Sequence, residues 1–151
     1  MPKPVVTVYT DGACEPNPGP GGWAAVLYHG SHKRVLTGRE PTTTSNRMEL
    51  QAAISALEAL REPCLVQMHT DSQYLQRGIT EWLPRWVSRG WRKSDKRPVL
   101  NVELWKKLHQ LTLRHEVQWH WVRGHSGDAN NELANRLASQ AMHGKATPRV
   151  F

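Results

Sequence analysis

The hydrophobic pattern of residues 45–60 predicts an α-helix of about four turns that is apolar over most of its surface. At about 100° per residue, its polar positions Gln51, Ser55 and Glu58 fall on one narrow stripe. A helix of this kind lies in the centre of a domain. Glu49 is the exception, because it points roughly 160° away from the polar stripe and therefore toward the interior.

Two interpretations of Glu49 are open at this point. Asn46 and Glu49 are three residues apart, which is the spacing of a capping box, and Glu49 would then bond a backbone N–H at the helix start. Alternatively, Glu49 brings a charge into the interior, which is costly unless the carboxylate is paired or binds a metal ion. The strands on either side of the helix bear on the choice.

Period-two and β-branched patterns predict five strands and an α/β domain. The first three form an antiparallel meander, with residues 15–22 as a turn-rich connection. The fourth follows the central helix and ends in Thr-Asp, as the first strand does. The five segments are residues 5–11, 22–28, 33–38, 64–71 and 117–122.

The repeated Thr-Asp ending places two acids together. A strand, a crossover and a similar strand favour parallel neighbours, so Asp11 and Asp71 would leave the sheet side by side on strands ~4.8 Å apart. Each alone is typical of a turn or a helix cap. Two such carboxylates repel each other unless a divalent cation lies between them. With Glu49, they form a set of oxygen ligands that suits Mg²⁺ or Mn²⁺ rather than zinc.

The charge of the chain points to a polyanionic partner. Its 151 residues fit one domain, and 20 Lys and Arg residues against 13 Asp and Glu residues give a formal charge of +7. Six basic residues and one acid lie between positions 85 and 97, next to Trp82, Trp86 and Trp91. Core packing of the tryptophans and a solvated basic face are the alternatives to nucleic-acid binding.

Other features limit the class of protein. Cys14 and Cys64 lack metal-ligand spacing, which argues against a zinc site or a disulfide framework and favours a reducing cytoplasm. No segment has the pattern of a signal peptide or a membrane span. An amphipathic helix is predicted from Asn101 to position 111, and a last helix over 130–142 has Asn135 at the flank of its buried stripe.

Several motifs, in this order and spacing, resemble those of the bacterial type I ribonuclease H family over nearly the whole chain. They occupy residues 9–14, 16–19, 21–23, 46–50, 70–74, 90–91, 124–125 and 131–132, with Trp82 and Trp86. The resemblance implies a five-stranded mixed sheet in the order 3-2-1-4-5, flanked by helices on both faces. It also implies an endonuclease that cuts the RNA strand of RNA–DNA hybrids and leaves 3′-hydroxyl and 5′-phosphate ends.

The resemblance also implies roles for individual residues. Asp11, Glu49 and Asp71 resemble the carboxylates of a two-Mg²⁺ site, and His125 resembles a loop residue that assists proton transfer or product release. The implied substrate-binding residues sense RNA 2′-hydroxyls, hold a DNA-strand phosphate or form a basic handle. The first group is Cys14, Asn17, Ser45, Asn46 and Gln73, the second Thr44 and Asn101, and the handle Trp82, Arg85, Trp86, Arg89, Trp91, Arg92 and Lys93.

Asn135 departs from the family pattern. It stands where the family has a fourth carboxylate on the last helix, and an amide keeps a ligating oxygen but no charge. We therefore expect weaker binding of at least one Mg²⁺ and reduced catalysis. A natural variant and an introduced substitution both fit. An introduced substitution is favoured, because no accompanying change is seen in the residues around position 135. Ser45 stands where many relatives have Asn, which weakens one expected contact.

These features together predict a catalytic domain over residues 1–143 with a loose tail over 144–151, in a cytoplasmic monomer without an obligate protein partner. A catalytically impaired hybrid-binding module is the first alternative. An integrase-like or junction-cutting nuclease is a weaker one, because the segments that sense 2′-hydroxyls and the basic handle are both present.

Overall fold

A five-stranded mixed sheet forms the centre of the molecule in the computed structural model, which describes residues 3–93, 95–97, 99–123 and 128–144. Its strand order is β3-β2-β1-β4-β5, as expected. β1, β2 and β3 run antiparallel, while β4 and β5 run parallel to β1. The strands are β1 (Val5–Cys14), β2 (Gly19–His29), β3 (His32–Thr43), β4 (Leu65–Thr70) and β5 (Glu116–Trp121).

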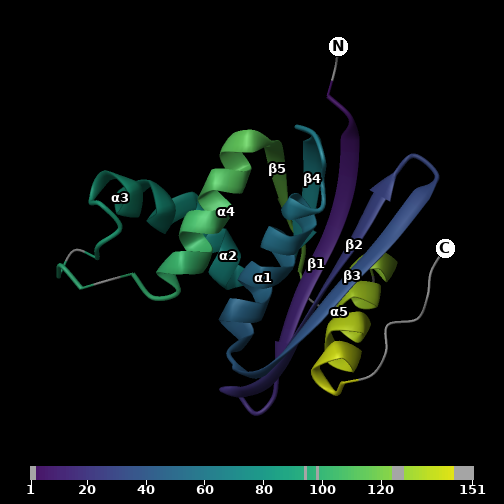
Figure 1. Ribbon diagram of the computed structural model, residues 1–151, viewed down its shortest axis with the longest axis horizontal. Helices are drawn as coiled ribbons and strands as arrows, with labels where there is room; N and C mark the ends of the chain where they lie inside the picture. The colour runs from purple at the N-terminus through teal and green to yellow at the C-terminus, as the bar shows by residue number, and fades with distance from the viewer. Residues whose placement is uncertain (1–2, 94, 98, 124–127, 145–151) are drawn as a thin grey trace.

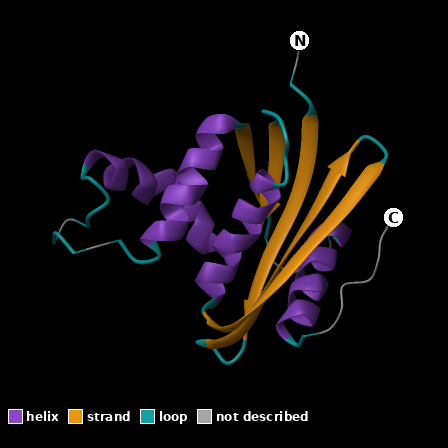
Figure 2. Ribbon diagram, viewed as in Figure 1, coloured by secondary structure: helices purple, strands orange, loops and turns teal. Residues whose placement is uncertain are grey.

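Helices cover both faces of this sheet (Figures 1 and 2). α1 packs on β1 and β2 and against α4 on one face, and α5 packs on β1, β2 and β3 on the other. A chain of short helices leads from β4 to α3, which stands far from the sheet (Figure 1). The helical segments are α1 (Ser45–Glu58), α2 (Gln73–Arg77), the π-helical turn η1 (Gly78–Trp82), α3 (Leu83–Ser88), α4 (Val102–Arg114) and α5 (Ala129–Met142).

The strands near the first turn are longer than predicted. β1 continues to Cys14 and β2 begins at Gly19, so part of the expected turn is paired strand. β3 runs through Pro41 to Thr43, where the sequence pattern predicted an end. The proline is tolerated because β3 is an edge strand, where a missing N–H breaks no interior hydrogen bond.

The central helix is as apolar as its pattern predicts. Seven of its residues are buried. On its polar stripe, the Gln51 amide donates to Ser55 Oγ at 2.9 Å, and Glu58 pairs with Lys107 of α4 at 3.0 Å. α4 adds the fully buried Trp105 to the same core. Gly78 lies against that indole, because a Cβ at this position would come within 1.9 Å of the Trp105 ring. η1 and α3 thereby pack close to α4.

The capping-box interpretation of Glu49 is wrong. Thr44 is the N-cap of α1, and its hydroxyl accepts the N–H of Arg47 at 3.2 Å. Asn46 lies within the helix and is exposed. Glu49 is therefore not needed at the helix start, and its inward direction requires another explanation.

Asn101 begins α4 as predicted, although its side chain does not cap the helix and its backbone is left-handed at φ 60°. Within the described residues, no helix combines the length and the hydrophobicity needed to cross a membrane.

Candidate active site

Three carboxylates from three different elements meet at one edge of the sheet. Asp11 comes from β1, Glu49 from the first turns of α1, and Asp71 follows β4. One ligand oxygen of each lies within 4.8 Å of the others. The parallel register accounts for the aspartates, because each stands two residues beyond the last paired residues, Tyr9 and His69. The prediction that these strands bring Asp11 and Asp71 together is confirmed.

Gly12 explains how α1 reaches this edge. A Cβ at Gly12 would lie 2.6 Å from the backbone nitrogen of Glu49 and 2.7 Å from the carbonyl carbon of Met48. Real Cβ atoms do not approach backbone so closely, so only glycine lets β1 and α1 touch here. The sequence pattern assigned Gly12 to a strand end and missed this close contact.

The carboxylates are held in an environment that opposes their charges. Asp11 is only 6% exposed, and its Oδ1 accepts the N–H of Gly12 at 2.9 Å. Burial, and then the neighbouring charge of Asp71, raise the pKa of Asp11 to about 7. Burial and the charges of Asp11 and Asp71 raise the pKa of Glu49 well above its ordinary value. Each pair of charges at this separation repels by about 3 kcal/mol at an effective dielectric constant of ~20.

One atom of the cluster lacks any hydrogen-bond partner. Glu49 as a residue is half-buried, yet its Oε2 is fully covered and receives no hydrogen bond. A buried carboxylate oxygen without a donor is costly unless a cation satisfies it. All three ligands are carboxylates, which is the donor chemistry of Mg²⁺ and Mn²⁺. The residues therefore fit a divalent metal ion.

The other two expected catalytic residues stay predictions. His125 lies outside the described residues. Asn135 is an exposed residue of α5, and no interaction in the described part of the chain joins it to the cluster. The nearby Asp128 caps α5, because its carboxylate accepts the N–H groups of Asn130 and Asn131.

Two residues of the expected 2′-hydroxyl-sensing group are bonded to each other. Asn17 and Ser45 bond each other, with Asn17 Nδ2 donating to Ser45 Oγ at 2.8 Å and the Ser45 N–H donating to Asn17 Oδ1 at 3.3 Å. The thiol of Cys14 lies 3.4 Å from the carbonyl oxygen of Thr43. Asn46 and Gln73 are exposed. These residues offer polar groups on the side of the sheet where β1 ends and α1 begins.

Arg47 connects α1 to the start of α4, a link that the sequence analysis did not single out. Its guanidinium donates to Asn101 Oδ1 at 3.0 Å and pairs with Glu103 at 2.8 Å. Asn101 Nδ2 in turn donates to the hydroxyl of Tyr74 at 3.1 Å. The amide of Asn101 is therefore held from both sides. Within the described residues, no hydrogen bond joins it to Thr44, the other residue expected to hold a phosphate.

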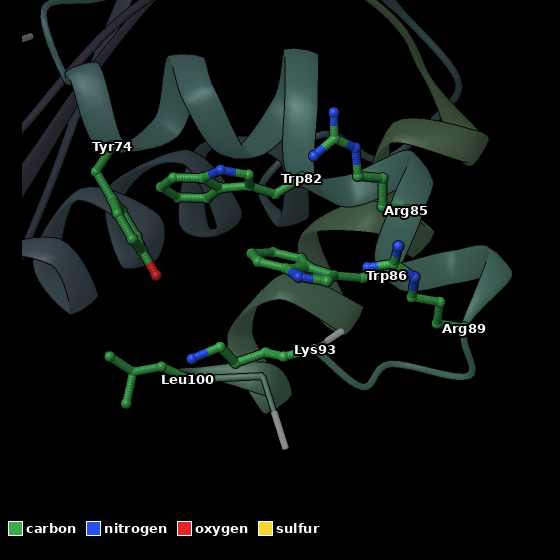
Figure 3. A pocket seen from close by; sticks show the side chains of 7 residues that line it. All are labelled: Tyr74, Trp82, Arg85, Trp86, Arg89, Lys93 and Leu100. Carbon is green, nitrogen blue, oxygen red and sulfur yellow. The ribbon is translucent and has the colours of Figure 1, made fainter. Parts of the chain in front are cut away.

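The basic handle contains a pocket of about 350 Å³ (Figure 3). The indoles of Trp82 and Trp86 lie between Tyr74 on one side and the guanidinium groups of Arg85 and Arg89 on the other. The two indole centroids are 5.7 Å apart, and both rings are half-buried. Trp86 packs against the buried core, which confirms the core-packing interpretation for that ring. Both rings also line a basic pocket, and their role in nucleic-acid binding stays a prediction. Lys93 and Leu100 complete the lining.

Two residues expected in the handle do not line this pocket. The ring of Trp91 packs against His109, and Lys106 Nζ lies 5.9 Å from its centroid. Arg92 is exposed and donates to the carbonyl of Lys96 at 3.3 Å. Neither lines the pocket.

Comparison with known proteins identifies the family. The RNase H family profile matches residues 3–143. A Ribonuclease HI from Caulobacter vibrioides is 55% identical over 148 residues, covering 98% of this chain and 99% of that protein. A Ribonuclease H from Alkalilimnicola ehrlichii is 60% identical over 134 residues, covering 89% of this chain and 92% of that protein. The crystal structure of LC9-RNase H1, described as a type 1 RNase H with the type 2 active-site motif, has a TM-score of 0.86 and 37% identity. The match covers 98% of this chain and 76% of that one.

Strand order and flanking helices define the ribonuclease H fold, and the acidic cluster at the sheet edge has a geometry that could hold a metal ion. The chain belongs to the ribonuclease H family, whose members are endonucleases that hydrolyse the RNA strand of RNA–DNA hybrids. The family, fold and enzyme class expected from the sequence are confirmed.

Proposed function

We propose that this chain cuts the RNA strand of RNA–DNA hybrids at Asp11, Glu49 and Asp71 by a two-metal mechanism and leaves 3′-hydroxyl and 5′-phosphate ends. The observation that supports this most strongly is the meeting of three carboxylates, two of them with raised pKa values, within 4.8 Å. Repulsion of this size is retained in a stable fold when a bound cation relieves it.

Mg²⁺ is the proposed metal, and Mn²⁺ a possible substitute. When bound, a pair of such ions supplies an activated water and stabilises the charge on the leaving oxygen. The chain's own contribution is to hold the ligands and to release protons. Because the pKa of Asp11 is about 7, metal binding must displace a proton from a large fraction of the molecules at neutral pH. Metal affinity should therefore rise with pH.

Asn135 and His125 are proposed to act on the same site. Asn135 would supply a neutral oxygen ligand in place of the family's fourth carboxylate, so that the site has three formal charges instead of four. His125 would move a proton or assist product release. The neutral Asn135 also favours the second candidate function, a hybrid-binding module with little turnover.

The proposed substrate surface extends from the carboxylates to the handle. Cys14, Asn17, Ser45, Asn46 and Gln73 would sense 2′-hydroxyls, which distinguish RNA from DNA. Thr44 and Asn101 would hold a phosphate of the DNA strand. The pocket of Trp82, Arg85, Trp86, Arg89 and Lys93 combines cations with indole faces, the pairing used to bind a sugar-phosphate backbone.

We further propose a cytoplasmic monomer with residues 1–143 as the catalytic domain and no obligate protein partner. The family profile ends at the same residue, 143. Size-exclusion chromatography with light scattering tests the monomer, and a dimer mass at micromolar concentration would contradict it.

A substrate panel tests the function. Hybrid, double-stranded RNA and double-stranded DNA are incubated with the protein over a range of Mg²⁺ and Mn²⁺ concentrations. We expect cleavage of the RNA strand of the hybrid alone. If the protein binds the hybrid without cleaving it at any metal concentration, and Asn135→Asp restores cleavage, this chain is a binding module of the same family.

A further inference from the structure

A second polar pocket adjoins the acidic cluster. It has a volume of about 320 Å³ and lies between the start of α2 and the end of β5. Asp71 forms part of its wall, so the pocket is continuous with the metal-binding edge. Gln73, Gln76 and Trp121 line it, and Arg123, just beyond β5, is its cation. Neither the sequence motifs nor the proposed mechanism assigns Arg123 a role.

The guanidinium of Arg123 is available for a ligand. Within the described residues, it has no ion pair and no side-chain hydrogen bond, although Asp71 lines the same pocket. Arg47 and Lys107, in contrast, are paired with Glu103 and Glu58. Arg123 is also exposed, so binding an anion would require little desolvation.

The lining groups match a phosphodiester with its sugar. A guanidinium binds phosphate through two parallel N–H donors, and the carboxamides of Gln73 and Gln76 can donate further hydrogen bonds. The indole of Trp121 offers an apolar surface to a ribose. Among the described residues, no acid other than Asp71 lines the pocket.

The position of the pocket indicates which strand it takes. Gln73 and Gln76 share one face of α2, while Tyr74 on the next face lines the handle pocket. α2 therefore separates two pockets, as if each received one strand of a duplex. The pocket with Arg123 contains Asp71, so its strand is the one whose phosphate lies at the carboxylates. Successive nucleotides advance by ~3.4 Å along the duplex axis, which limits the bound phosphate to a near neighbour.

We infer that Arg123 binds a phosphate of the RNA strand one or two nucleotides from the scissile bond and thereby holds that strand in register over the acidic cluster. This inference rests on the proposed function, because it requires that the cleaved strand lie across Asp71.

Binding in the absence of metal tests this role apart from turnover. Hybrid affinity is measured by fluorescence anisotropy in EDTA over a range of salt concentrations for the wild type, Arg123→Ala and Arg123→Lys. Arg61→Ala is the matched control, because it removes one exposed positive charge beside the end of α1, away from the cluster. We expect Arg123→Ala to raise Kd by about tenfold and to reduce the salt slope by about one, with Arg123→Lys between it and the wild type.

Neutral linkages then locate the contact. Hybrids carrying a single methylphosphonate at successive positions of either strand are compared between the wild type and Arg123→Ala. The inference requires the penalty of the substitution to vanish only when the neutral linkage lies at one or two RNA positions beside the cleavage site. A penalty no larger than that of Arg61→Ala, a contact mapped to the DNA strand, or a penalty that no linkage removes would each overturn it. A wild type that prefers no hybrid would instead overturn the proposed function.

Discussion

At the scale of single residues, the acidic cluster sets stability against function. Burial and mutual repulsion favour protonated Asp11 and Glu49, whereas metal binding needs both ionised. The buried Oε2 of Glu49 also indicates that a cation is needed, because no donor in the described structure forms a hydrogen bond to it. The metal-free protein should therefore be less stable at neutral pH than it would be without the buried charges of the cluster.

The pH dependence of stability follows from the raised pKa of Asp11. Its pKa is about 7 in the folded protein against an ordinary value of 3.8, so between these pH values the folded state binds a proton that the unfolded state does not. The contribution of protonated Asp11 to the free energy of unfolding is fully present below about pH 4. It is lost as the pH rises to 7, and the loss is on the order of 2–4 kcal/mol. We expect Asp11→Asn to remove this loss, so that the metal-free variant has the higher Tm at pH 8 by calorimetry.

A second group acts in the opposite direction. Burial lowers the pKa of His115, whose contribution to stability is lost as the pH falls below about 6.5. Comparing Asp11→Asn with the wild type at each pH cancels this effect, because His115 is unchanged. If the Tm of Asp11→Asn equalled that of the wild type both at pH 8 and at pH 4, this result would contradict the raised pKa of Asp11.

The neutral residue at position 135 should determine the metal requirement. If Asn135 stands in the fourth ligand position, Asn135→Asp adds a negative charge to the cluster and strengthens metal binding. We expect the Mg²⁺ concentration for half-maximal cleavage to fall about tenfold and kcat to rise. The neighbouring exposed residue Arg136, changed to Gln, is the control for a general change of charge on α5. An unchanged Mg²⁺ requirement would place Asn135 outside the site.

At the scale of elements, the strand order and the meeting of Asp11 with Asp71 could be predicted, because parallel strands joined by a crossover end at the same edge. The inward direction of Glu49 could also be predicted from helical phase. The close contact at Gly12 and the bond network of Asn101 could not, since both depend on backbone approach between segments distant in sequence. Pairing also extended β2 and β3 beyond their local patterns.

Gly12 should control how close α1 lies to β1. In Gly12→Ala, a methyl group would overlap the backbone at Met48 and Glu49, so α1 must shift away. Such overpacking costs about 1–3 kcal/mol. We expect a lower Tm and a larger loss of cleavage than of hybrid affinity, because the shift moves Glu49 from the aspartates but leaves the handle in place. Wild-type cleavage by a folded Gly12→Ala protein would show that the contact does not set the site.

At the scale of the whole molecule, a chain with a formal charge of +7 carries an acidic cluster at one edge of its sheet. The separation of basic residues from the acidic cluster suits a polyanion that is held by distant cations and cut at a metal site. The handle pocket lies on the far side of α2 from the pocket at Asp71, so it should contribute to substrate binding more than to the chemical step.

The handle can be tested by its kinetic signature. We expect Arg85→Ala with Arg89→Ala, or Trp82→Ala alone, to raise KM at least tenfold while changing kcat less than threefold. Arg34→Ala with Arg61→Ala removes the same charge at the other end of the sheet and is the control. A fall in kcat at unchanged KM would contradict a binding role for the pocket.

The most direct test of the acidic cluster is single-turnover cleavage by Glu49→Gln, measured beside its hybrid affinity in EDTA. The substitution keeps the shape of the side chain and removes its charge. We predict an unchanged Kd within about twofold, cleavage slowed by about 100-fold or more, and no cleavage by the wild type without a divalent cation. Cleavage by Glu49→Gln at the wild-type rate, or by the wild type in EDTA, would contradict it.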